Sequence, residues 1–168
     1  MNSQEQDDTL NEWLGRHRGL LLKVARSFSS ESNDRDDLLQ EIVFQVWCSI
    51  PQYKNSVAES TWIYRVALYT AISWSRKESK RRERKREWTQ EQDVVDQSIV
   101  DPQVEWLYER IAELDPIDRS LTLLMLEGFS YREMSETLGM SESNVGVRIN
   151  RIKKQLTDKL QQEKNRES

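Results

Sequence analysis

Apolar residues recur at intervals of three and four along most of this chain, and few helix-breaking residues interrupt them. The 168 residues include only five glycines and three prolines. This spacing places apolar side chains on one face of an α-helix, whereas a half-buried strand would need strict alternation. A chain of this length forms one ordinary domain or two small ones. We therefore predict an all-α protein.

The charge divides the chain into segments. The formal net charge is −4, yet residues 76–86, RKESKRRERKR, hold eight cations and two acids, and cations return from Arg148 onward. Residues 87–105 hold six acids and no lysine or arginine. A single basic run is as often a solvated helix end as a binding surface, but two such regions indicate two nucleic-acid-facing modules. We predict two small helical domains, 8–86 and 105–162, joined by a flexible acidic linker at 87–104.

The scarcity of cysteine, histidine and long apolar runs narrows the classes of function open to the chain. Cys48 and His17 are the only cysteine and histidine, which leaves little material for a disulfide framework, a metal site or a histidine-based triad. We predict no catalytic residues, no metal and no cofactor. No apolar run approaches the roughly 18 residues of a membrane span, and the acidic N-terminus lacks the apolar core of a secretory signal. We predict a cytoplasmic protein without membrane insertion.

The first predicted helix begins near Thr9, because Thr9 and Glu12 have the spacing of a capping box. Its apolar stripe consists of Leu10, Leu14, Leu21, Val24 and Phe28. The polar segment SSESND then ends this helix.

The next predicted helix, 35–50, has two contrasting faces. Its core face consists of Leu38, Leu39, Ile42, Val43 and Val46, and its outer face of Asp37, Gln40, Glu41, Phe44 and Gln45. An exposed phenylalanine among carboxylates indicates a protein partner, because carboxylates repel phosphates. The alternative is a solvated face on which Phe44 packs against a neighbour.

A third predicted helix, 61–78, is apolar on both sides. Ile63, Ala67, Ala71 and Trp74 form one face, and Trp62, Val66 and Tyr69 form the other. The basic run follows directly, and aromatic rings beside cations are the combination that holds single-stranded nucleic acid. We predict that Ile63, Ala67 and Trp74 belong to the core, and that Trp62 and Tyr69 face nucleic acid.

The second module carries clear helix signals. Asp101–Pro102 and Asp115–Pro116 each pair a capping residue with a proline at the first helical position, and Asp118 lies in the first turn that follows. Leu121, Leu124 and Met125 are predicted to point inward, and Gly128 to end that helix. Further signals are a Ser130–Glu133 capping box, buried Met134 and Leu138, a turn at Gly139 and a cap at Ser141.

The last predicted helix has the pattern of a DNA-recognition helix. Its core side is Val145, Ile149, Ile152 and Leu156; its opposite side is Ser143, Val147, Asn150, Arg151 and Lys154, flanked by Asn144 and Arg148. Arginine can read guanine and asparagine can read adenine in the major groove, while lysine anchors phosphate. Together with the preceding short helix, this predicts a helix-turn-helix.

In order and spacing, these segments resemble the extracytoplasmic-function (ECF) sigma factors, the small two-domain type of the sigma-70 family, from about Leu10 to Leu160. DRDDLLQEIVFQVW is similar to region 2.2, which binds the β′ clamp helices of RNA polymerase, and this implies a polymerase contact by Asp37, Gln40, Glu41 and Phe44. The segment from Tyr53 to Lys77 is similar to regions 2.3 and 2.4, which open the −10 promoter element and hold a flipped base in the loop 53–60. The resemblance implies −10 contacts by Tyr53, Lys54, Asn55, Trp62, Arg65, Tyr69, Arg76 and Lys77.

Residues 115–156 resemble region 4, which reads the −35 element. This implies DNA contacts by Arg132, Ser143, Asn144, Val147, Arg148, Asn150, Arg151 and Lys154. The implied partners are core RNA polymerase (β′ clamp helices and β flap), promoter DNA and an anti-sigma factor. The chain departs from the family pattern at Tyr69, where many members carry asparagine, and at Gly146 and Val147, where members often carry a cation and serine.

Two other functions compete with a promoter-specificity subunit. A two-domain transcriptional regulator would use only the C-terminal helix-turn-helix, and it would not need the acidic-aromatic face of helix 35–50. A nucleic-acid-processing enzyme would need a clustered carboxylate, Cys/His or phosphate-loop motif, which the sequence does not contain.

Overall fold

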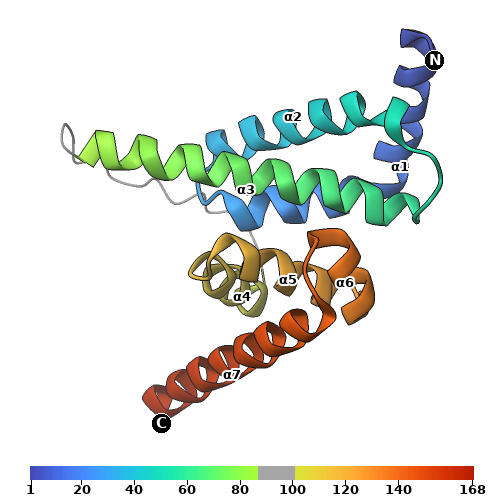
Figure 1. Ribbon diagram of the computed structural model, residues 1–168. Helices are drawn as coiled ribbons and strands as arrows, with labels where there is room; N and C mark the ends of the chain where they lie inside the picture. Colours follow the sequence, from blue (N-terminus) through green and yellow to red (C-terminus); the bar gives the residue numbers. More distant parts are fainter. Residues whose placement is uncertain (87–100) are drawn as a thin grey trace. The chain divides into compact units, whose positions relative to one another are not determined.

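The computed structural model describes residues 1–86 and 101–168, in which helices and short connections occur and no strand does (Figure 1). By compactness the chain divides into two units, 1–108 and 109–168. The boundary falls inside helix α4, Pro102–Ala112. The predicted all-α fold is confirmed.

The first unit is built on three long helices that pack against one another: α1 (Ser3–Phe28), α2 (Ser32–Ser49) and α3 (Glu59–Arg86). A single 3-10 turn, η1 (Ile50–Gln52), leads from α2 into the loop before α3. Much of the predicted apolar pattern is buried. The fully or almost fully buried side chains include Leu21, Val24, Leu38, Ile42, Val46, Ile63, Tyr64, Ala67, Leu68 and Ala71.

Helix α1 starts six residues before the predicted Thr9. Its cap is Asn2, whose side chain accepts the Glu5 amide at 2.8 Å while the Glu5 carboxylate accepts the Asn2 amide at 3.0 Å. This reciprocal capping box satisfies two donors that a helix start leaves free. The Thr9 hydroxyl instead donates to the Glu5 carbonyl within the helix, at 2.8 Å. The predicted Thr9–Glu12 box is therefore wrong.

Tertiary contacts hold the additional turn of α1 against α2. The buried Gln6 side chain donates to the Trp47 carbonyl at 2.6 Å, and the Trp47 indole donates to Asp7 at 2.8 Å. The polar sequence before Thr9 carries no apolar stripe, so periodicity alone does not reveal these partners.

The second unit contains the rest of α4 and helices α5 (Pro116–Leu126), α6 (Tyr131–Leu138) and α7 (Glu142–Glu167), with α5 and α6 both packed on α7. Its core consists of Ile111, Leu121, Leu124, Met134, Val145, Ile149 and Ile152. Met125 and Leu156 were also predicted to lie on the core side of their helices, but both side chains are only partly buried.

Local signals in the second unit are confirmed. Ser130 and Glu133 form a complete capping box, and Ser141 accepts the Asn144 amide at 3.1 Å. Gly139 ends α6 with a φ of 66°, a left-handed conformation that favours glycine. The turn between α6 and α7 therefore has the backbone geometry of a helix-turn-helix.

The predicted linker, 87–104, falls largely outside the described residues. At its described end, the Asp101 carboxylate accepts the Gln103 amide at 2.8 Å and α4 begins at Pro102, as predicted.

Candidate protein and nucleic-acid interfaces

The outer face of α2 presents carboxylates around an exposed aromatic ring. Asp37, Gln40 and Glu41 are exposed, and the Phe44 side chain is 55% exposed. Phe44 stacks on Trp47, with ring centroids 6.3 Å apart and planes 21° from parallel. Trp47 is fixed in turn by its indole hydrogen bond to Asp7. The ring of Phe44 is therefore held in place without being buried.

A shallow apolar groove of about 430 Å³ lies beside Phe44 on α1 and α2. Its lining residues are Leu10, Leu39, Gln40, Val43, Phe44 and Trp47. The helical pattern predicts Leu39 and Val43 as core residues, but both are only partly buried and line this groove. The sequence does not predict that Leu10 and Trp47 line the same groove, because they belong to different helices. Exposed apolar surface beside carboxylates suits a protein partner better than phosphate.

The loop before α3 is held by an aromatic cluster. The Tyr53 ring packs edge-on against Trp13, with centroids 5.4 Å apart, and lies 5.6 Å from the Trp62 ring. The Tyr53 hydroxyl donates to the Val57 carbonyl at 2.9 Å, and the Trp62 indole donates to Ser49 at 3.0 Å. Tyr53 and Trp62, both predicted to contact nucleic acid, thus also shape the loop from within.

Two of the residues predicted to contact the −10 element lie at the surface of this loop. Lys54 and Asn55 are exposed, and Asn55 has a φ of 56°. Asparagine is one of the few residues that adopts this left-handed conformation readily. The aromatic cluster therefore presents Lys54 and Asn55 on a defined backbone rather than on a free loop.

Along α3 the exposed side chains change from aromatic to cationic. Tyr69 is 46% exposed, and Arg76 and Lys77 are exposed further along the helix, while Arg65 is partly buried. Trp74, predicted as core, is partly buried. This surface combines a ring with cations, as sites for single-stranded nucleic acid do.

The start of α3 is tied to α1 by a charged cluster. Glu59 accepts hydrogen bonds from Arg16, at 3.0 and 2.9 Å, and lies 2.7 Å from His17 Nε2. Burial of the Glu59 carboxylate raises its pKa, but the hydrogen bonds and charges of Arg16 and His17 outweigh burial, so the pKa of Glu59 lies below its ordinary value. Glu59 is thus held as a carboxylate at the first residue of α3.

In the second unit, the face of α7 opposite its core is open to solvent. Val147 is 66% exposed, and the other exposed predicted residues are Ser143, Asn144, Asn150, Arg151 and Lys154. On α6, Arg132 is exposed and pairs with Glu136 at 3.3 Å. This distribution of short polar groups near the start of a helix and cations further along suits the major groove.

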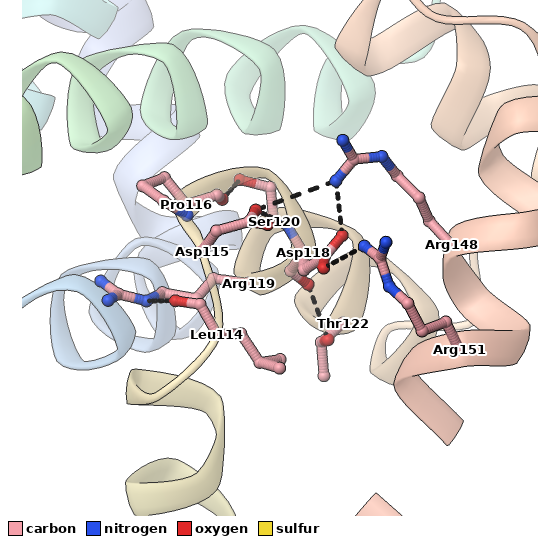
Figure 2. Close-up of polar contacts among 9 residues, drawn as sticks. All are labelled: Leu114, Asp115, Pro116, Asp118, Arg119, Ser120, Thr122, Arg148 and Arg151. Atoms are coloured by element: carbon pink, nitrogen blue, oxygen red, sulfur yellow. Dashed lines mark hydrogen bonds and ion pairs between the residues drawn. The ribbon is translucent and has the colours of Figure 1, made fainter. Parts of the chain in front are cut away.

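Two arginines of α7 converge on one carboxylate (Figure 2). Arg148 donates to Asp118 at 2.7 Å and Arg151 donates to the second oxygen of the same carboxylate at 2.6 Å. The Asp118 side chain is 6% exposed, whereas those of Arg148 and Arg151 are 28% and 51% exposed. Sequence reasoning placed Asp118 at the start of α5 but missed this pairing, because the partners are 30 and 33 positions apart.

Within the described parts of the chain, no helix is long and apolar enough to cross a membrane. No group of three or more histidine, cysteine, aspartate or glutamate side chains in those ranges is arranged to hold a metal ion.

Two family descriptions match this chain, "Sigma-70 region 2" over residues 13–81 and "Sigma-70, region 4" over residues 104–156. The chain belongs to the sigma-70 family. The first match contains the loop before α3 and the α2 residues that line the groove, whereas Leu10 of the groove precedes it; the second match contains α5 to the middle of α7. The loop before α3, the α2 side of the groove and the exposed face of α7 therefore lie within sigma regions.

Curated relatives agree with this assignment. The chain is 30% identical over 125 residues to the ECF RNA polymerase sigma factor SigX of Bacillus subtilis, covering 68% of this chain and 64% of the relative. It is 27% identical over 161 residues to the ECF RNA polymerase sigma factor SigE of Mycolicibacterium smegmatis, covering 89% and 61%. The chain thus spans less than two thirds of the length of both.

Solved structures show the same fold. The sigma factor RpoE of Bartonella quintana, in complex with the anti-sigma factor NepR, matches with a TM-score of 0.74 at 18% identity, over 90% of this chain and 96% of that chain. CnrH, in complex with the cytosolic domain of CnrY, matches with a TM-score of 0.66 at 20% identity, over 95% and 92%.

Proposed function

We propose that this chain is an ECF sigma factor that directs core RNA polymerase to specific promoters and initiates DNA opening, with no catalysis of its own. The observation that carries the proposal is the presence of two different surfaces in one sigma-70 chain: an apolar groove on α1 and α2 with exposed carboxylates beside it, and an exposed polar face on a helix-turn-helix. A subunit that acts on core RNA polymerase acts in the cytoplasm, and this is the location that we propose for the chain.

The α2 surface is the proposed polymerase-docking site. Asp37, Gln40 and Glu41 are exposed around Phe44 and its groove. An apolar ring in a groove supplies contact area, and the surrounding carboxylates select a basic partner surface and exclude DNA. The β′ clamp helices are the proposed partner here, and the β flap is the proposed partner of the second unit.

The loop before α3 and the exposed face of α3 form the proposed −10 surface. Lys54 and Asn55 lie at the loop surface, and Tyr69 precedes the cations Arg76 and Lys77. Taking a base out of the stack costs a few kcal/mol, which stacking on an aromatic ring offsets by about 1–3 kcal/mol per base. Trp62 and Tyr53 support this surface through the aromatic cluster behind the loop.

The exposed face of α7 is the proposed −35 reader, with Arg132 of α6 as a phosphate contact. Its polar residues match the donor and acceptor groups that discriminate bases in the major groove. The acidic balance of the chain fits a subunit that binds promoters within a polymerase complex, since the polymerase supplies further phosphate contacts.

We further propose control by an anti-sigma factor. Two solved structures that share this fold were determined in complex, one with the anti-sigma factor NepR and the other with the cytosolic domain of CnrY. An anti-sigma factor that covers the groove at Phe44 would compete directly with the polymerase.

The docking proposal is tested with a double charge reversal, Asp37→Arg with Glu41→Arg. We expect loss of core polymerase from pull-downs, with an unchanged helical circular dichroism spectrum. The matched control reverses two exposed acids of α7, Asp158→Arg with Glu167→Arg, and should still capture polymerase. Normal capture by the α2 variant would contradict the docking site.

The same preparations separate a sigma factor from a regulator that works alone. A sigma factor should select promoter duplexes only together with core polymerase. Selective binding of a duplex by the isolated chain, without polymerase capture, would favour the regulator.

A further inference from the structure

We propose that Asp118 is a positioning residue for promoter recognition: it holds Arg151 at the reading face of α7 and withholds Arg148 from DNA. This inference rests on the proposed −35 reading by α7. Asp118 belongs to α5 and lies outside the proposed contact surface. The inference assigns different roles to Arg148 and Arg151, which were both predicted to contact the −35 element.

The Asp118 carboxylate is itself firmly placed. Its backbone amide donates to the Asp115 side chain at 2.9 Å, and its carbonyl accepts the Thr122 hydroxyl at 2.7 Å (Figure 2). The residue lies in the first turn of α5, where the helix dipole favours a negative charge. A buried carboxylate of this kind requires charged partners, and the two arginines of α7 are the partners that the structure shows.

The two arginines differ in what they can still reach. Arg148 is mostly buried, and a second carboxylate, Asp115, lies 3.9 Å from its Nη1. Arg151 is half exposed and uses only Nη2 on Asp118, so the other donors of its guanidinium remain available. Arg151 also follows Val147 by four residues and Asn144 by seven, which places all three on one face of the helix.

Fixing one end of the guanidinium reduces the rotamers that Arg151 must lose on binding a base. A long side chain that is already oriented discriminates better than a mobile one, because less conformational freedom is lost on contact. The carboxylate also neutralises part of the positive charge of the pair, so the arginines contribute less to sequence-independent attraction to phosphates. Asp118 therefore favours base reading over general DNA affinity.

The test uses holoenzyme reconstituted from the full chain and core RNA polymerase. Binding is measured on duplexes that carry a randomised −35 hexamer and a constant remainder, and the bound fraction is sequenced. The best duplex is then titrated with salt. The variant is Asp118→Asn, and the control is Asp115→Asn, which removes the same charge from the same helix start while asparagine still caps the helix.

We expect Asp118→Asn to reduce base preference roughly tenfold at one or two adjacent hexamer positions. We also expect the slope of log affinity against log salt to become steeper, by up to about 0.9 for each arginine released to phosphate. Asp115→Asn should retain the wild-type base preferences. Unchanged preference and slope in folded Asp118→Asn would overturn the proposal, as would an equal loss on every sequence.

A second variant decides the matter if Asp118→Asn does not fold. Arg151→Lys changes an exposed side chain and keeps its charge opposite Asp118, but it lacks the fork that reads a base. It should lose preference at one or two adjacent positions, and a wild-type profile would overturn the proposal. Asn144→Ala distinguishes failure of this inference from failure of the proposed −35 reading by α7. If Asn144→Ala alters the base preferences while the Asp118 and Arg151 variants do not, α7 reads DNA and only the role of Asp118 is refuted.

Discussion

Removing the ring of Phe44 should weaken polymerase docking more than any other single truncation on α2. A phenylalanine side chain buries about 200 Å² when fully covered, and Phe44 is 55% exposed in the free chain. A partner that covers the remainder removes roughly 100 Å² of apolar surface from water, worth about 2.5 kcal/mol. Phe44→Ala should therefore raise the Kd for core polymerase roughly 30- to 70-fold.

The control for this prediction is Tyr69→Ala. Tyr69 is 46% exposed on α3 of the same unit, so its truncation removes a similar amount of internal packing without touching the α2 groove. Fluorescence anisotropy of labelled chain titrated with core polymerase measures both variants, at a temperature where circular dichroism shows each to be folded. Equal Kd values for Phe44→Ala, Tyr69→Ala and wild type would refute the docking role of the ring.

Two further predictions concern stability. Gly146→Ala should raise the thermal midpoint of the second unit, since a glycine inside a helix costs about 1 kcal/mol and a Cβ there would meet the Tyr131 ring at an ordinary 3.5 Å; a lowered midpoint by calorimetry would contradict this. Glu59 has a pKa below its ordinary value, so its stabilising contribution is complete above about pH 4.3 and is lost as the pH falls through its lower folded pKa. Denaturant titrations of wild type and Glu59→Gln should thus differ at neutral pH and converge in acid, and a difference that does not change with pH would exclude this role.

Signals that act within a few residues were predicted correctly from the sequence. The Ser130–Glu133 box, the turn at Gly139 and the caps at Asp115 and Ser141 all depend on hydrogen bonds between near neighbours. The buried stripe of α7 followed from the helical period alone. The predicted start of α1 near Thr9 was wrong, because contacts with Trp47 hold the preceding residues in the helix.

By itself, the sequence determined that this protein is helical, where α5, α6 and α7 begin, and which face of α7 is exposed. It also carried the order of motifs that identifies the sigma-70 family. These properties are local, since they depend on spacing along a single helix or on a cap three residues away.

Only the tertiary structure decided how residues from different helices combine. Leu10 of α1 lines an apolar groove together with Phe44 and Trp47 of α2, and Tyr53 packs between Trp13 and Trp62 to hold the loop before α3. Asp118 pairs with both Arg148, whose side chain is mostly buried, and Arg151, whose side chain is half exposed. No spacing rule connects such partners, because their distance in space is set by helix packing and not by their separation along the chain.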